Sequence, residues 1–262
     1  MRLYLEVARL SFRRHLAYRA ATLAGLFTNA VFGVMIATVF RALYDGGNDS
    51  TVAGFSLPEA LTFVWAAQSL IMVVYLWGWW EVAAAVKTGD IVVDLMKPYA
   101  FQGYWLGRDL GRAACHALTR LLPTLLFGVL LYDLALPRSA GTWFAAGLSV
   151  LLAVVVSFGW RFLLNLSAFW LLDARGVNMM AMVVVNFFSG LLVPLAFFPD
   201  WLRTVANLLP FRAFVMVPIE VLLGQRGLGS ALVIQVFWAV ALALLAQAVL
   251  ALAVRKVVIQ GG

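Results

Sequence analysis

The chain has very little charge and very few side chains suited to metal binding or redox chemistry. Its 262 residues include one cysteine and two histidines, and only 12% of them are charged. A soluble domain usually carries about 25% charged residues. A single cysteine excludes a disulfide within the chain, and so few ligands leave a metal site almost nothing to be built from.

Sequence motifs of nucleotide and hydrolytic chemistry are also missing. The chain has no G-x-x-x-x-G-K-[ST] loop to hold nucleotide phosphates, no H-E-x-x-H and no G-x-S-x-G. His15 and His116 have no adjacent carboxylate at ligand spacing, so we interpret both as interfacial side chains. We therefore predict that the chain is not an enzyme and binds no cofactor or metal itself. The net charge of +7 comes without a basic run, which argues against a nucleic-acid partner.

Long apolar runs are what the chain does have. It is 64% apolar with a mean hydropathy of +0.96, and several neutral runs reach about 20 residues, the length that crosses a bilayer. This composition predicts an all-α integral membrane protein with one transmembrane domain over residues 1–262. Six transmembrane helices are predicted, over residues 21–40, 58–80, 117–136, 142–172, 177–198 and 231–254.

The positive charges indicate the orientation of these spans. Residues 1–19 have the pattern of a basic amphipathic helix lying in the membrane interface, although a charged flank that only sets orientation fits the same residues. Thirteen of the nineteen lysines and arginines fall on the side of the N-terminus and five on the opposite side, with Arg161 inside a span. The positive-inside rule then places both termini and residues 87–112 in the cytoplasm.

Residues 87–112 form the longest charged break between apolar runs, and they lie on the predicted cytoplasmic side. Asp90, Asp94 and Lys97 recur at helical spacing and would share one face of a short helix. Ile91 and Leu95 would lie toward the other face. A short amphipathic helix between two spans suits the docking of a soluble partner, and a solvated loop with an interfacial turn fits the composition equally well.

Charged and polar residues inside the spans need partners. Arg161 lies within the fourth predicted span, with Asn165 one turn further along. A central arginine costs about 2.5–3.5 kcal/mol on insertion scales, so it should face protein or water. Glu81, at the cytoplasmic end of the second span, is the partner we expect at similar depth. A structural ion pair and a role in a transport path both remain open.

Three glycines, Gly103, Gly107 and Gly111, recur every four residues and make a smooth helical face that another backbone can approach closely. We favour packing against another helix of the same chain over packing against a second protein.

Residues 199–230, between the fifth and sixth predicted spans, form an outward hairpin of short apolar helices. Each is too short to cross a bilayer, so we expect a re-entrant arrangement covered by protein. This hairpin could be an outer gate or a static plug. The candidate gate residues are Pro194, Pro199, Trp201, Pro210 and Pro218.

Two stretches and the order of parts resemble a known family. GDIVVDLMKP at residues 89–98 is similar to the G-x-I/L-x-x-x-L-x-x-P signature of one bacterial branch of the ABC-2-type transporter permeases. SGLLVP at 189–194, FPDW at 198–201 and LPF at 209–211 resemble the family's outer motif of small residues, a proline, P-x-W and a later proline. The resemblance covers essentially the whole chain.

The resemblance implies a permease subunit of an ATP-driven exporter in the bacterial inner membrane, in contact with membrane lipid. It implies a dimer with a second copy or a paralogous permease, and a separate ATP-binding cassette subunit that binds the ATP and Mg. The helix at residues 90–97 would be the coupling helix. Its docking residues would be Gly89, Asp90, Ile91, Asp94, Leu95 and Lys97. The alternative is a membrane scaffold or assembly subunit without a transport path.

Overall fold

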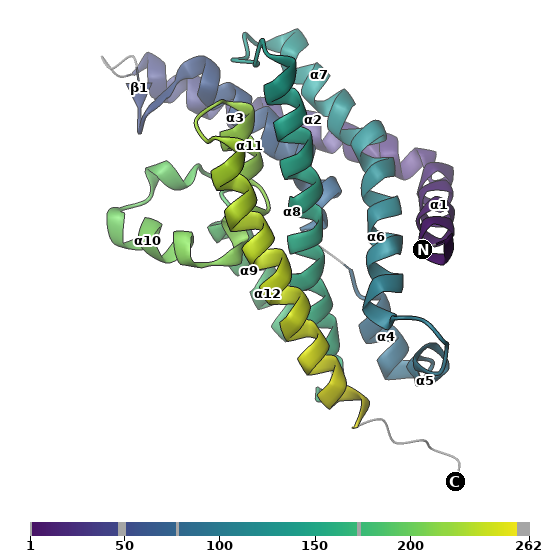
Figure 1. Cartoon of the computed structure of the whole chain (residues 1–262). Helices are drawn as coiled ribbons and strands as arrows, with labels where there is room; N and C mark the ends of the chain where they lie inside the picture. Colours follow the sequence, from purple (N-terminus) through teal and green to yellow (C-terminus); the bar gives the residue numbers. More distant parts are fainter. Residues whose placement is uncertain (1, 47–50, 77–78, 172–173, 256–262) are drawn as a thin grey trace.

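The computed structural model describes residues 2–46, 51–76, 79–171 and 174–255, and within them the chain is almost entirely helical (Figure 1). The elements are α1 (Arg2–Ala17), α2 (Arg19–Asp45), β1 (Thr51–Val52), β2 (Phe55–Ser56), α3 (Leu57–Leu70), η1 (Ile71–Tyr75), α4 (Glu81–Thr88), α5 (Ile91–Leu95), α6 (Phe101–His116), η2 (Ala117–Leu121), α7 (Leu122–Leu131), α8 (Ala140–Leu166), η3 (Ser167–Phe169), α9 (Arg175–Phe188), η4 (Leu195–Phe197), α10 (Asp200–Leu208), η5 (Pro210–Ala213), α11 (Met216–Leu222) and α12 (Leu228–Val254). The two strands form a small antiparallel hairpin. Residue 172, the predicted end of the fourth span, lies outside the described residues.

Among the described residues, five helical stretches are long and apolar enough to cross a membrane, which confirms the prediction of a multi-pass helical membrane protein. They are Arg19–Asp45, Leu57–Tyr75, Phe101–Leu131, Ala140–Phe169 and Leu228–Val254. The continuous fifth span predicted over residues 177–198 is wrong.

The helix found in place of the fifth span is α9, which has 14 residues. It is about 21 Å long, less than the hydrocarbon core of about 30 Å. The chain turns after it because Gly190 has a left-handed backbone with φ +79°, and Pro194 then precedes the short helix η4.

The helices α8 and α12 lie side by side and run in the same direction (Figure 1). Near their starts Ser149 Oγ donates to Gln235 Oε1 at 2.9 Å, and further along Gly159 faces Leu242. Because α12 begins at the same end as α8, residues 170–227 must carry the chain back along the full length of α8. The short α9 and the segments after it make this return.

The second long helix also ends earlier than predicted. Its last turn, η1, is a π-helix that stops at Tyr75, which has a left-handed backbone with φ +55°. The span therefore ends at residue 75 and not at residue 80. Trp79 is partly buried against the cluster of Trp105 and Phe162, with its ring 5.7 Å from that of Trp105 and stacked on that of Phe162.

The third long helix begins at residue 101, so the predicted start at residue 117 is wrong. Phe101 and Trp105 are buried, which pulls the first half of this helix into the molecule. Residues 101–112, predicted as cytoplasmic surface, are therefore largely interior.

The helix α1 packs along the glycine face of α6, as predicted for packing within the chain. A Cβ atom at Gly111 would lie 2.0 Å from the carbonyl oxygen of Ala8. Ser11 Oγ donates a hydrogen bond to the carbonyl of Arg108 at 2.7 Å. Only glycine allows the two backbones to come this close, so these contacts fix α1 against α6.

A second, smaller apolar cluster lies at the end of the molecule that carries α4, α5 and the last turns of α12, here called the α5 end. Its buried members include Val82, Ile91, Phe101, Phe162 and Leu250. They come from five different helices, so this cluster holds α5 in place.

Candidate functional site

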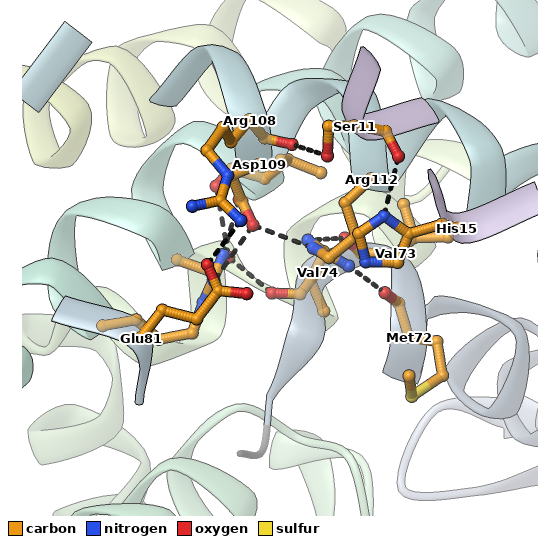
Figure 2. Close-up of polar contacts among 12 residues, drawn as sticks. Ser11, His15, Met72, Val73, Val74, Glu81, Arg108, Asp109 and Arg112 are labelled. Carbon is orange, nitrogen blue, oxygen red and sulfur yellow. Dashed lines mark hydrogen bonds and ion pairs between the residues drawn. The ribbon is translucent and has the colours of Figure 1, made fainter. Parts of the chain in front are cut away.

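Three charged side chains meet in the interior between α6 and α8 (Figure 2). The carboxylate of Asp109, with 3% of its side chain exposed, accepts hydrogen bonds from two arginines. Arg161 donates through Nη1 at 3.1 Å and Nη2 at 2.7 Å. Arg112 donates through Nε at 2.9 Å. The two-pronged contact with Arg161 is the strongest geometry for this kind of pair.

This cluster also satisfies the broken end of the second long helix. Arg112 donates to the carbonyl of Met72 and, at 2.9 Å, to that of Val73. Ser157 Oγ donates at 2.6 Å to the carbonyl of Val74. The last carbonyls of a helix have no partner within it and carry partial negative charge. A cationic side chain therefore stabilises this internal helix end.

The backbone of Tyr75 is held at the centre of the same cluster. The guanidinium of Arg112 lies 4.4 Å from the centre of its ring, and that of Arg161 lies 5.4 Å away. Both distances are within the range of a cation–π contact. The two arginines thus fix the ring of Tyr75, whose left-handed backbone is one that a tyrosine rarely adopts.

The predicted ion pair between Arg161 and Glu81 is wrong. Glu81 accepts from Arg108 at 2.6 Å and lies 3.9 Å from Arg14, and its side chain is 43% exposed. The third span was predicted to begin at residue 117, but the helix begins at residue 101. It therefore carries Asp109 into the interior, where Asp109 pairs with Arg161.

Asn165 connects two helices. Its Nδ2 donates to the carbonyl of Trp79 at 2.9 Å, and its Oδ1 accepts from the backbone N–H of Ala83 at 3.0 Å. These bonds attach the start of α4 to α8. Whether Asn165 or Arg161 also touches a transported molecule stays a prediction.

Sequence reasoning missed Asp109, Arg112 and Ser157 as members of this site. The available signal was the i, i+3 spacing of Asp109 and Arg112 on one helix, next to the aromatic residues Phe101 and Trp105. Opposite charges at that spacing, on a face that also carries aromatic residues, indicate an interior pair.

A narrow cavity of about 60 Å³ lies beside Arg161. Its walls include Trp79, Asn165, Val185 and Phe214, the last of them from the hairpin of residues 199–230. This volume has room for a few water molecules at most. Among the described residues, no group of three histidine, cysteine or acidic side chains is placed to hold a metal ion.

The short helix α5 stands at the α5 end as a separate, compact unit. Gly89, with φ +84°, ends α4 and turns the chain into α5. Ile91 is 2% exposed and packs inward, and its contact with a partner stays a prediction. Val93 and Met96 are 61% and 77% exposed and were missed.

The helix α5 is shorter than the one predicted over residues 90–97: Asp94 lies within it, Asp90 precedes it and Lys97 follows it. Asp90 and Lys97 are exposed, and Lys97 Nζ lies 2.6 Å from Asp94 Oδ1. This hydrogen bond raises the pKa of Lys97, so the lysine stays positively charged. Leu95 is partly buried and packs on the apolar cluster at the α5 end. A partner would therefore meet two exposed apolar side chains framed by charges.

The hairpin of residues 199–230 has an exposed part and a buried part. The helix α10 exposes Trp201 to 69%, whereas residues 210–219 are buried. Phe211 packs on Trp160 with ring centres 5.0 Å apart, and Gln235 Nε2 donates to the carbonyl of Ala213 at 3.1 Å. The buried part therefore reaches deep alongside α8.

The four prolines of the hairpin occupy starts of elements. Pro194 precedes η4, Pro199 precedes α10, Pro210 opens η5 and Pro218 lies in the first turn of α11. These are positions where a missing N–H costs nothing. Their role in gating stays a prediction.

An ion-pair network joins the buried part to the start of α12. Arg212 donates to both carboxylate oxygens of Glu220, at 2.9 and 3.1 Å. Glu220 also pairs with Arg226, and Arg212 with Asn207. Glu220 thus ties three consecutive segments of the hairpin together.

These features define a multi-pass helical membrane protein with an interior charge cluster, a small helical unit at one end and a buried hairpin toward the other. The sequence model of the family described as ABC-2 family transporter protein matches residues 31–261. The match covers most of the chain, so the chain belongs to the ABC-2 family of transporter proteins. A search of curated proteins found no match.

Proposed function

We propose that the chain is the membrane-spanning permease subunit of an ATP-driven ABC-2 exporter. A separate ATP-binding cassette subunit, which binds the ATP and Mg, docks on α5. Family membership supports the permease role. The observation that carries the docking proposal is the exposure of Val93 and Met96 beside Asp90 and Lys97 on a firmly held short helix.

The direction of the helices supports six crossings of the membrane. Since α8 and α12 run the same way, α9 and the buried hairpin together would make the fifth crossing in broken form. Both termini and α5 then lie on one side, where the positive-inside rule places the cytoplasm. The chain would sit in a bacterial inner membrane, with α1 in the interface against lipid.

The interior contacts offer a route from the docking helix to the outward hairpin. Ile91 packs in the same cluster as Phe162, one residue from Arg161 along α8. Arg161 and Asp109 pair with Arg112, which holds the end of the second long helix. Phe214 of the hairpin lines the cavity beside Arg161. A movement of α5 would thus reach the hairpin through packed side chains.

The hairpin would act as the outer gate of a path shared between two permeases, either two copies or a copy and a paralogue. Its buried part is non-helical in places and deep within the protein, as a re-entrant segment must be. The ion pairs of Glu220 would keep it closed until ATP binding draws the cytoplasmic ends together.

Affinity isolation of the tagged chain from its native membrane tests this function. We expect an ATP-hydrolysing cassette protein to co-purify, and the mass of the complex to require two permease chains. The double variant D90K/D94K should lose this subunit while inserting normally, and R41Q/R138Q, which changes charges elsewhere, should retain it. A chain that inserts and assembles without any ATP-binding partner would instead favour a scaffold or assembly subunit.

A further inference from the structure

Arg120 is a buried arginine of the third long helix that has no carboxylate beside it. It lies in η2, the π-helical turn between α6 and α7, and the residue is 8% exposed. Its Nη2 donates a hydrogen bond to the carbonyl of Ala21 in α2 at 2.7 Å, and its Nε is buried without a hydrogen-bond partner. The other buried arginines among the described residues, Arg112, Arg161 and Arg212, each pair with a carboxylate.

The helix α2 is shaped to receive this guanidinium. Gly25 lies one turn after Ala21, and a Cβ atom at Gly25 would overlap the guanidinium of Arg120. The charged group therefore rests directly against the backbone of α2. A buried charge without an opposite charge is costly, and one neutral carbonyl offsets only part of that cost. Because Ala21 is exposed, an anion from outside the chain can reach this contact.

The contact lies at the level of the lipid head groups. The helix α2 has 27 residues and is about 40 Å long, which exceeds the hydrocarbon core of about 30 Å. Ala21 and Gly25 lie about 3 and 9 Å from its start, so they fall near the boundary of that core. Tyr18, exposed immediately before the helix, suits the same level.

The start of α2 adds a second attraction for an anion. Its N-cap residue makes no side-chain hydrogen bond, and its first turn contains no acidic residue. The first N–H groups of a helix have no partner within it and carry partial positive charge. Phosphate groups bind at such helix starts and also pair with guanidinium groups through two parallel hydrogen bonds. The two features, one turn apart, favour the same ligand.

We propose that Arg120 and the start of α2 bind the phosphate group of a membrane phospholipid, from the leaflet in which α2 begins. The phosphate supplies the negative charge that Arg120 lacks within the described chain. It joins α2 to η2, two segments that are 99 residues apart at the contact of Ala21 with Arg120. This phospholipid is a structural ligand and not a transported molecule, so the inference does not depend on the proposed function.

Thermal unfolding of the full chain in a maltoside detergent, which contains no phosphate, tests the site. The chain is titrated with dioleoylphosphatidylglycerol. The two comparisons are dioleoylglycerol, which has the same acyl chains and no phosphate, and inorganic phosphate. We expect the phospholipid to raise the unfolding midpoint until the site is saturated, because a ligand of the folded state stabilises that state. The two comparison compounds should leave the midpoint unchanged.

The variant Arg120→Gln distinguishes a ligand site from an arginine that only ties two helices together. Without phospholipid, this variant should unfold at the midpoint of the unchanged chain or above it, because it removes an unpaired charge and keeps a donor for Ala21. Its half-saturating phospholipid concentration should be at least about fivefold higher. The matched control is Arg41→Gln, which removes an exposed arginine at the other end of α2 and should respond as the unchanged chain does.

Four results would overturn the proposal. An equal response to dioleoylglycerol would mean that the acyl chains suffice, and an equal response to inorganic phosphate would mean that the site takes a free anion. The same half-saturating concentration in Arg120→Gln and Arg41→Gln would place the phospholipid elsewhere. A midpoint of Arg120→Gln below that of the unchanged chain, without phospholipid, would make Arg120 a purely structural residue.

Discussion

Asp109 accepts hydrogen bonds from two arginines on different helices, and one of them, Arg112, also holds the end of the second long helix. Removing one partner of a buried ion pair leaves the other charge unpaired and costs about 3–5 kcal/mol. At the scale of single residues, the stability of the interior therefore depends on this cluster more than on the exposed pairs of Glu81, since exposed ion pairs contribute at most about 1 kcal/mol.

A double-mutant cycle distinguishes the observed pair from the one the sequence suggested. Asp109→Asn and Arg161→Gln should each lower the midpoint of thermal unfolding in detergent, and their effects should be strongly non-additive because they remove one interaction. Glu81→Gln combined with Arg161→Gln should be additive. The assignment would be contradicted if Glu81 coupled to Arg161 while Asp109 showed no coupling to Arg161.

The contact of α1 with Gly111 gives a second prediction at this scale. In Gly111→Leu the side chain would collide with the backbone of Ala8, and α1 would be displaced. Ser11→Cys on a Cys115→Ala background, buried in the unchanged protein, should then react with a water-soluble maleimide. The matched control is Gly147→Leu, where no atom lies within 4 Å of the added Cβ, and which should leave Ser11→Cys protected.

Sequence reasoning at the residue scale succeeded where the chemistry is local. Arg161 has to have a partner in any apolar span, and the glycine spacing on α6 indicates a close helix contact. The identity of the partner could not be predicted, since it depends on where α6 begins. That start is set by Phe101 and Trp105 packing into the cluster at the α5 end, which is a tertiary contact.

At the scale of elements, the helices α2, α8 and α12 match the predicted spans because each is an uninterrupted apolar run. The end of η1 and the end of α9 do not match. In the first case, Arg112 and Ser157 donate hydrogen bonds to backbone carbonyls that the next turn of a longer helix would otherwise bond. In the second, Gly190 permits a left-handed turn inside an apolar stretch. Hydropathy alone contains neither signal.

The docking role of α5 can be tested with its exposed apolar residues. Met96→Asp should lower ATP hydrolysis by the assembled complex at least tenfold, because a charge would replace an apolar contact at the centre of the interface. Leu208→Asp, at an equally exposed site on α10, should leave ATP hydrolysis unchanged. If Met96→Asp retains full hydrolysis and full recovery of the ATP-binding subunit, α5 is not the docking element.

The closure of the hairpin can be tested through Glu220. In Glu220→Ala, Arg212 loses its carboxylate partner and the buried part should open more often. A cysteine at Val215, which is fully buried, should then react faster with a membrane-impermeant maleimide added from outside, on the Cys115→Ala background. Leu208→Cys, 72% exposed, is the positive control. If Val215→Cys reacts at the same rate in Glu220→Ala as in the protein with Glu220, these ion pairs do not hold the hairpin closed.

At the scale of the whole molecule, the order of parts was predictable from the sequence: a basic amphipathic start, apolar spans, a charged break and a proline-rich hairpin. The family match over residues 31–261 agrees with that order. The broken fifth segment could not be predicted, because only the parallel direction of α8 and α12 reveals that residues 170–227 return along the length of α8.

The central claim is that ATP used at the α5 end moves the hairpin toward the other end. The most direct measurement is the labelling rate of Val215→Cys from outside, on the Cys115→Ala background, in proteoliposomes that hold the complete complex. We predict that ATP and Mg change this rate in the complex with an unchanged α5. They should leave it unaltered in matched proteoliposomes of D90K/D94K, which should lack the ATP-binding subunit. A rate that is the same with and without ATP in the former, while ATP is being hydrolysed, would contradict the account.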